Sequence, residues 1–140
     1  MTSIVFSLFE DSELAKMVTN KLRFEIGEFV LREFPDSETY LQIKSEVQNK
    51  NVIIITSMND PNKKFLPLLF CIAALRDLGA TSIGLIAPYL AYMRQDTRFV
   101  AGEAITADYF AAILSQKIDW LLTVEPHLHR HKSLTEIYTI

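Results

Sequence analysis

Hydrophobic and polar positions along this chain follow two periods, one typical of strands and the other typical of helices. The strand candidates are four largely apolar runs at residues 4–9, 51–57, 82–87 and 119–124. The last three are apolar almost throughout, as expected for strands that helices cover on both faces. We therefore expect these three runs to be adjacent buried strands of one sheet.

Apolar residues at helical spacing separate these runs. The predicted helices cover residues 11–22, 65–79 and 105–117. We expect Asp11 or Ser12 to cap the first helix and Thr106 to cap the third. Pro67 fits only in the first turn of the second helix, which should end at Gly79. The side chains expected to face the core are Leu14, Met17, Val18, Leu22, Leu68, Leu69, Ile72, Leu75, Phe110, Ile113 and Leu114.

A β-hairpin is predicted between the first helix and the strand run at residue 51. Residues 28–34 and 39–47 flank the turn-forming sequence PDSE, and the second segment alternates apolar and polar side chains. Because the other strands alternate with helices, the expected fold is a three-layer α/β domain with a mostly parallel sheet and a protruding β-hairpin. In such sheets ligands bind beyond the carboxyl ends of strands, where the polar residues 88–104 and 125–131 are expected.

The composition limits the partners and the compartment. With 140 residues, 49% of them apolar, the chain matches one domain with one core. A formal net charge of −3 gives no basic surface for nucleic acid or an anionic membrane, and no apolar run approaches the ~20 residues that span a bilayer. The start has no basic leader pattern, and Cys71, the single cysteine, is expected in the core. We expect a cytoplasmic protein that binds neither nucleic acid nor membranes.

The polar stretch at residues 94–98 is a candidate for binding a nucleotide. The chain has only four glycines and neither a P-loop nor a dinucleotide fingerprint, so side chains would have to hold any phosphate. Arg94 and Arg98 offer cations for phosphate oxygens. Gln95 can pair with a base or ribose edge, and Asp96 is an acceptor. A solvated loop with an Arg/Asp pair has the same pattern, so both interpretations stay open.

All three histidines of the chain, His127, His129 and His131, lie within five residues after the last strand. In extended geometry they would share one side of the chain, as a three-nitrogen zinc site requires. Pro126 and the cationic neighbours of His131 oppose such a site. Magnesium needs fewer protein ligands, because it takes carboxylate, water and phosphate oxygens. A solvated loop, a metal site and a nucleotide site are therefore all open.

Four segments together resemble one enzyme family. FPDSE at 34–38, PYLAYMRQD at 88–96, GEAIT at 102–106 and VEPHLH at 124–129 occur in the order and approximate spacing seen in ribose-phosphate pyrophosphokinases, which make phosphoribosyl pyrophosphate. The resemblance runs along the whole chain. It implies that residues 1–140 are a single amino-terminal α/β domain of an enzyme whose subunits have two phosphoribosyltransferase-like domains.

The resemblance also implies roles for individual residues. It places FPDSE in a protruding loop that contacts the adenine of ATP in a neighbouring subunit, and His127 at the Mg²⁺ and the triphosphate as a catalytic and metal-binding residue. The residues that it places at the nucleotide are Phe34, Asp36, Glu38, Arg94, Gln95 and Asp96. Many members of the family have glycine at the position of Ser37 and aspartate at the position of Glu125.

The reaction implied is transfer of a pyrophosphoryl group from Mg·ATP to the anomeric hydroxyl of ribose 5-phosphate, which gives phosphoribosyl pyrophosphate and AMP. In the family, the ribose 5-phosphate loop and a mobile catalytic loop lie in the carboxy-terminal domain, which is absent from these 140 residues. We therefore expect the chain alone to be inactive and to form a homo-oligomer. A non-catalytic regulatory or associated homologue and a histidine-cluster metal-binding module are the alternatives.

Overall fold

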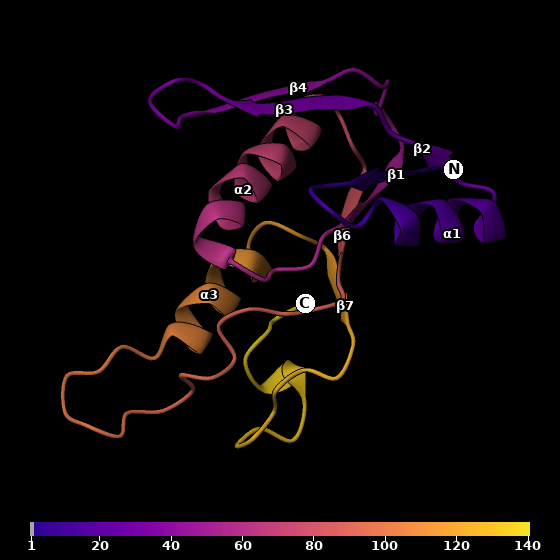
Figure 1. The fold of residues 1–140 in the computed structure, drawn as a ribbon. Helices are drawn as coiled ribbons and strands as arrows, with labels where there is room; N and C mark the ends of the chain where they lie inside the picture. The colour runs from indigo at the N-terminus through magenta and orange to yellow at the C-terminus, as the bar shows by residue number, and fades with distance from the viewer. Residues whose placement is uncertain (1) are drawn as a thin grey trace.

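The computed structural model describes residues 2–140 as a three-layer α/β domain (Figure 1). In chain order its elements are β1 (Ser3–Ser7), α1 (Ser12–Leu22), β2 (Glu25–Ile26), β3 (Phe29–Glu33), β4 (Thr39–Ile43), β5 (Asn51–Ile55), α2 (Pro61–Asp77), β6 (Ser82–Ala87), α3 (Thr106–Ser115), β7 (Trp120–Thr123) and the short 3-10 helix η1 (Leu134–Glu136). One sheet has the order β2-β1-β5-β6-β7, and every pairing in it is parallel. The predicted fold class and the adjacency of β5, β6 and β7 are confirmed.

The two faces of the sheet pack against different helices. On one face, side chains of β1, β5 and β6 form a large apolar cluster with α2 and α3. On the other face, Ala15 of α1 lies against Val5, Ile53 and Ile55. Successive residues of a strand point to opposite faces, so Ile54 joins the first cluster while its neighbours join the second. This two-sided burial explains why β5 is apolar throughout.

Strand β7 is less buried than predicted, because it is the edge strand of the sheet. Trp120 and Leu122 are exposed, since α1 covers the opposite end of that face, near β1 and β2 (Figure 1). The prediction that three further side chains face the core is also wrong, because Met17, Leu22 and Ile113 are exposed. The other predicted core residues are buried or half-buried: Leu14, Val18, Leu68, Leu69, Ile72, Leu75, Phe110 and Leu114.

Side chains predicted to cap helices bond to other loops instead. Asp11 precedes α1 without a side-chain cap, and its carboxylate accepts hydrogen bonds from the Ser57 N–H at 2.5 Å and the Ser57 hydroxyl at 3.1 Å. Thr106 is the first residue of α3, and its hydroxyl donates to Gln95 Oε1 at 3.2 Å. Each side chain therefore holds a loop at the carboxyl edge of the sheet.

Helix α2 begins earlier than predicted. It starts at Pro61, a favourable first position for proline, so Pro67 lies inside the helix and not in its first turn. The predicted end is confirmed by Gly79, which follows the helix with φ of +89°. Cys71 is buried on the core side of α2, as expected. No helix within residues 2–140 has the length and apolar character needed to cross a membrane.

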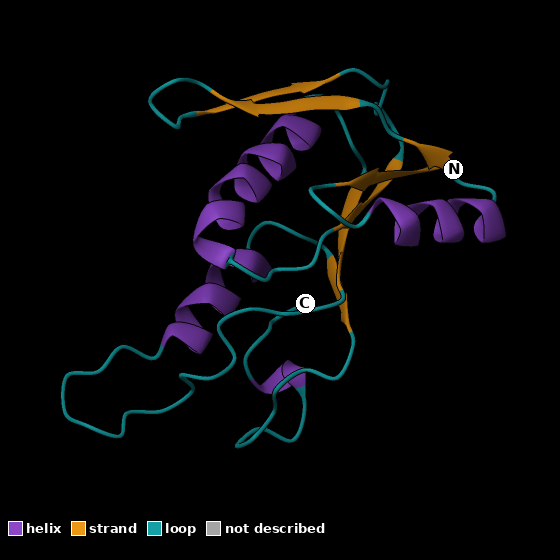
Figure 2. Cartoon of the chain, viewed as in Figure 1, coloured by secondary structure: helices purple, strands orange, loops and turns teal. Residues whose placement is uncertain are grey.

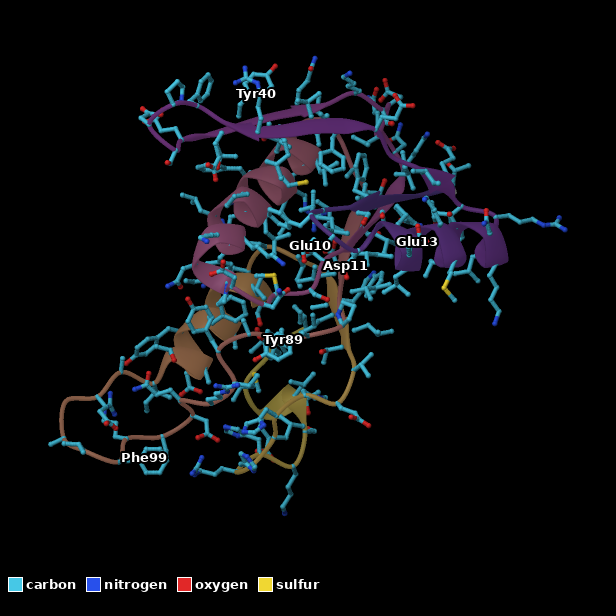
Figure 3. All side chains as sticks on the ribbon, viewed as in Figure 1. Glu10, Asp11, Glu13, Tyr40, Tyr89 and Phe99 are labelled. Atoms are coloured by element: carbon cyan, nitrogen blue, oxygen red, sulfur yellow. The ribbon has the colours of Figure 1, made fainter. Side chains whose placement is uncertain are left out.

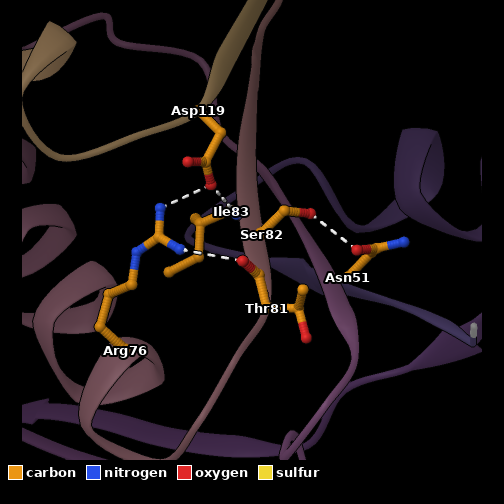
Figure 4. A network of polar contacts seen from close by, with 6 residues as sticks. All are labelled: Asn51, Arg76, Thr81, Ser82, Ile83 and Asp119. Carbon is orange, nitrogen blue, oxygen red and sulfur yellow. Dashed lines mark hydrogen bonds and ion pairs between the residues drawn. The ribbon is translucent and has the colours of Figure 1, made fainter.

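A polar network ties the end of α2 to the start of β6 and β7 (Figure 4). The Asp119 carboxylate accepts hydrogen bonds from the Ile83 N–H at 2.6 Å and from the Arg76 guanidinium at 2.5 Å. Burial alone would raise the pKa of Asp119, but the hydrogen bonds from Ile83 and Arg76 and the charge of Arg76 outweigh it, and the pKa lies below its ordinary value. This network fixes the amino-terminal edge of the sheet, opposite the loops that carry the polar candidates.

Strands β3 and β4 form the predicted antiparallel hairpin, which lies across the end of α2 (Figure 1). Its base packs on the core through Leu41 and Ile43. At its tip the Phe34 N–H donates to the Glu38 carbonyl at 2.8 Å, and the Ser37 N–H donates to the Phe34 carbonyl at 2.9 Å. Ser37 has φ of +70°, as in hairpin loops that end in a left-handed residue.

Candidate functional site

A pocket of about 450 Å³ lies beyond the carboxyl ends of β5, β6 and β7. Its walls are residues 59–61 after β5, residues 89–95 after β6, residues 124–127 after β7 and the first residue of α3. Figure 2 shows the connections after β6 and β7 as long teal segments in the lower part of the view. Parallel α/β sheets bind ligands at this edge, so the pocket is the candidate site.

The loop after β6 places Arg94 in the pocket. Leu90, Ala91 and Met93 of this loop are buried and anchor it to the core. Tyr92, with φ of +59°, turns the chain so that the exposed Arg94 lines the pocket. None of the ion pairs found within residues 2–140 involves Arg94. Its guanidinium is therefore available to an anionic ligand.

Gln95 lines the same pocket and joins it to α3. Its side-chain oxygen accepts the hydrogen bond from Thr106, and its backbone carbonyl accepts one from the Ala107 N–H at 3.2 Å. These bonds fix the loop immediately after Arg94. The predicted grouping of Arg94 and Gln95 is thus matched by their common place on the pocket wall.

The three histidines do not converge on one point. Glu125, with φ of +45°, turns the chain after β7 and places His127 on the pocket wall. The His129 ring packs edge-on against the His127 ring with centroids 3.8 Å apart, whereas His131 Nδ1 lies 3.1 Å from a Glu136 carboxylate oxygen. Within residues 2–140 no three His, Cys, Asp or Glu side chains are grouped so as to hold a metal ion. The described residues therefore do not form the three-nitrogen site that the spacing allowed.

Asp96 does not line the pocket, although it follows two residues that do. Its side chain is buried under the loop, and its carboxylate pairs with the guanidinium of Arg130 at 2.5 Å. Arg98 also lies outside the pocket, where its Nε donates to the Glu103 carbonyl at 2.8 Å. Only part of the polar stretch therefore faces the candidate site.

The remaining candidates lie at the hairpin tip, away from the pocket. Phe34, Asp36 and Glu38 are exposed there, and Asp36 Oδ1 accepts a hydrogen bond from the Glu38 N–H at 3.2 Å. The Arg32 guanidinium lies between two aromatic rings, 4.9 Å from the Phe34 centroid and 4.1 Å from that of Tyr40. The hairpin tip that carries these residues projects beyond α2 (Figure 1).

The sequence-based prediction named no candidate residue on one wall of the pocket, the loop after β5. Asn59 and Asp60 line it, and Asp60 has φ of +53° just before α2. The buried Lys64 holds this loop by donating to Asn59 Oδ1 at 2.7 Å and to the Ser57 carbonyl at 3.1 Å. The signal was present, because these residues directly follow the apolar strand β5 at the ligand-binding edge.

The parallel sheet, the hairpin and the pocket define a three-layer α/β domain with a candidate ligand pocket at the carboxyl edge of its sheet. Residues 3–117 match the sequence profile described as the N-terminal domain of ribose phosphate pyrophosphokinase, and the chain belongs to this family.

Individual relatives agree with the family profile. Ribose-phosphate pyrophosphokinase from Saccharolobus solfataricus is 44% identical over 96 residues, which are 67% of this chain and 33% of the relative. Ribose-phosphate pyrophosphokinase 1 from Streptococcus pneumoniae is 34% identical over 125 residues, which are 88% of this chain and 39% of the relative. The fold matches the crystal structure of phosphoribosylpyrophosphate synthetase from Mycobacterium smegmatis with a TM-score of 0.87 at 22% identity, over 99% of this chain and 46% of that one. The chain thus spans less than half of the length of each of these relatives.

Proposed function

We propose that this chain is the ATP-contacting amino-terminal domain of a ribose-phosphate pyrophosphokinase. The observation that carries the proposal is that Arg94 and His127, from loops after different strands, line one pocket at the carboxyl edge of the sheet. A guanidinium without a carboxylate partner within residues 2–140, and an imidazole that lines the same pocket, suit the oxygens of a polyphosphate. The triphosphate of ATP is therefore assigned to this pocket, with Gln95 beside it.

The proposed reaction of the whole enzyme is attack by the anomeric oxygen of ribose 5-phosphate on the β-phosphorus of ATP. The new O–P bond forms as the bond between the β-phosphorus and the oxygen bridging to the α-phosphorus breaks, and AMP leaves. The proton of the anomeric hydroxyl is released in the same step. Negative charge spreads over the phosphate oxygens in such a transition state, so positioning and cations supply most of the catalysis. Arg94 would clamp the phosphates, and His127 would hold their orientation.

Magnesium fits the donors of this pocket. Bound Mg²⁺ would neutralise part of the negative charge of the phosphates. It takes mainly oxygen ligands and needs few from the protein when phosphates and waters complete its shell. Of the two carboxylates that line the pocket, Asp60 pairs with Lys63 at 3.1 Å, which leaves Glu125 beside His127. Glu125 and His127 are therefore the residues that would hold the ion.

Calorimetric titration of the chain with Mg·ATP tests the nucleotide site. Arg94→Ala and His127→Ala should each weaken binding by about tenfold or more, because the first removes a phosphate partner and the second a side chain that would hold the phosphates and their metal ion. Arg98→Ala is the matched control for charge, since Arg98 lies outside the pocket, and His131→Ala is the control for the histidines. Wild-type affinity in both Arg94→Ala and His127→Ala would contradict the site. The same His127→Ala change in a longer form with both domains should lower turnover by about tenfold or more.

We further propose that the chain forms a homo-oligomer in which the hairpin tip completes the site of a neighbour. The outward position of Phe34, remote from the pocket of its own chain, supports this arrangement. Mixing Phe34→Ala protein with Arg94→Ala protein tests it, because a mixed assembly contains sites with an intact arginine from one chain and an intact ring from the other. Regained ATP binding is expected after mixing. A monomer in light scattering at high concentration, or no regain on mixing, would refute the sharing.

A further inference from the structure

A buried ion pair joins the loops that follow β6 and β7. The Arg130 guanidinium donates to the Asp96 carboxylate at 2.5 Å, across 34 positions of sequence. The Asp96 side chain is 1% exposed and that of Arg130 is 45% exposed, so the cation reaches from the surface to a buried partner. A buried carboxylate is unfavourable without a paired cation, and this contact therefore fixes the place of Arg130.

Arg130 has a second contact with the loop after β6. Its guanidinium carbon lies 4.8 Å from the centroid of the exposed Phe99 ring, which is within reach of a cation–π interaction. The Phe99 N–H donates to the Glu103 carboxylate at 2.9 Å, and this bond holds the turn that carries the ring. In Figure 3, Phe99 lies on its loop next to the side chains of the C-terminal segment. The guanidinium is thus held by a buried carboxylate and a ring together.

Both partners are close in sequence to residues of the pocket wall. Asp96 directly follows Arg94 and Gln95, and Arg130 comes soon after His127. Because so little chain intervenes, the ion pair constrains the two walls against each other. We propose that Arg130 is a positioning residue that acts by pairing with Asp96. The pair sets the separation between Arg94 and His127.

This inference rests on the proposed nucleotide site and refines it. The sequence made Asp96 a candidate nucleotide-binding residue, whereas the structure buries its side chain beneath the loop and pairs it with Arg130. An arginine that is already paired and stacked is also a poor candidate for a phosphate ligand, because it would have to leave both partners. The two roles of Arg130, positioning and direct phosphate contact, give different results in the experiments below.

Hydrogen exchange of the 140-residue chain without ligand tests the pairing itself. Arg130→Gln and Asp96→Asn each weaken the ion pair, and Lys132→Gln is the matched control, because it removes a neighbouring charge that has no ion pair within residues 2–140. Exchange of the hydrogen-bonded N–H groups of Phe99, Ala107 and Leu128, which lie on these loops or bond to them, should rise by about tenfold in the first two variants and stay unchanged in the control. Arg130→Lys keeps the charge but loses the planar guanidinium, so its hydrogen exchange should lie between that of the wild type and that of Arg130→Gln. Unchanged exchange in both Arg130→Gln and Asp96→Asn would refute the pairing.

Affinity for Mg·ATP in the same variants tests the positioning role. If Arg130 acts only through Asp96, then Arg130→Gln, Asp96→Asn and the double variant should all raise the Kd by one common factor, on the order of tenfold. Lys132→Gln should leave the Kd unchanged. If Arg130 contacts phosphate itself, the double variant should bind more weakly than Asp96→Asn alone. That result would overturn the positioning role.

Failure of this inference is distinguishable from failure of the nucleotide site. If Arg94→Ala weakens binding while both single variants of the pair bind like the wild type, the site stands and the positioning role falls. If the wild type does not bind Mg·ATP, the proposed function is refuted. Hydrogen exchange in Arg130→Gln and Asp96→Asn still shows whether the ion pair holds the two loops. Circular dichroism shows whether each variant folds. Arg130→Lys, the mildest change, replaces Arg130→Gln in both assays if the latter does not fold.

Discussion

Ser37→Gly is expected to stabilise the domain by relieving strain at the tip of the hairpin. Ser37 has φ of +70° in the loop that joins β3 and β4. A left-handed conformation is roughly 1–2 kcal/mol less favourable for a residue with a β-carbon, while glycine adopts it freely. The greater freedom of glycine in the unfolded chain opposes this gain by roughly 0.5–1 kcal/mol. The net stabilisation should be about 0.5–1 kcal/mol.

This gain should appear in the melting of the whole domain, because Leu41 and Ile43 pack the hairpin on the main core. With an unfolding entropy of ~2.1 cal/mol/K per residue, the expected rise in Tm is about 2–3 °C. Scanning calorimetry at neutral pH measures it.

Two controls separate the backbone effect from side-chain effects. Ser37→Ala keeps the β-carbon and should change the Tm little. Gly102→Ala is the reverse change, because Gly102 has φ of +88° and no atom lies within 4 Å of an added β-carbon, so only backbone strain opposes it. It should cost about 1 kcal/mol. If Gly102→Ala lowers the Tm while Ser37→Gly leaves it unchanged or lowers it, the reasoning about Ser37 is refuted.

The lowered pKa of Asp119 means that this carboxylate stabilises the fold fully above the pKa that it has in the unfolded chain, and that the stabilisation is lost as pH falls through the lower folded value. The difference in urea stability between wild type and Asp119→Asn should therefore narrow from pH 7 to pH 3, whereas an unchanged difference would contradict the pKa shift. Burial raises the pKa of Cys71 to about 12, so a disulfide reagent at pH 8 should label one thiol per chain in urea and none in the folded protein. The 140-residue chain should make no phosphoribosyl pyrophosphate from Mg·ATP and ribose 5-phosphate, because it spans about a third of the curated relatives; product above background in purified protein would disprove this.

Most of the fold was predictable because periodicity reports burial. The apolar run of β5 indicates a strand that helices cover on both faces, and the apolar stripe of α2 indicates a helix that packs on one of those faces. The exposure of Met17 and Trp120 was not predictable. Both are apolar side chains that would be buried if further helices packed over them, and the sequence does not show that none does. Strand β2 has only two residues and depends on its pairing with β1, which no local pattern indicates.

The candidate site was predictable only in part, because its residues lie on loops. Arg94 and Asp96 are close in sequence and look like members of one binding set, yet the turn at Tyr92 sends the first into the pocket and the second beneath the loop. The three histidines look equivalent in the same way, and the turn at Glu125 leaves only His127 on the pocket wall. Left-handed residues other than glycine have no clear sequence signal, so these divisions follow from tertiary structure.

The loops that form the pocket are held in place by residues that do not line it. Asp11 holds the loop after β5, and the pair of Asp96 and Arg130 holds the loops after β6 and β7. Loops are otherwise the most mobile segments of a domain, so such anchors are needed for a fixed site. Arg94 and His127 line the pocket and take part in none of the ion pairs found within residues 2–140. Substituting either of these two should therefore change affinity with little change in Tm, whereas substituting Asp11 should lower the Tm, since it leaves the half-buried donors of Ser57 without their acceptor.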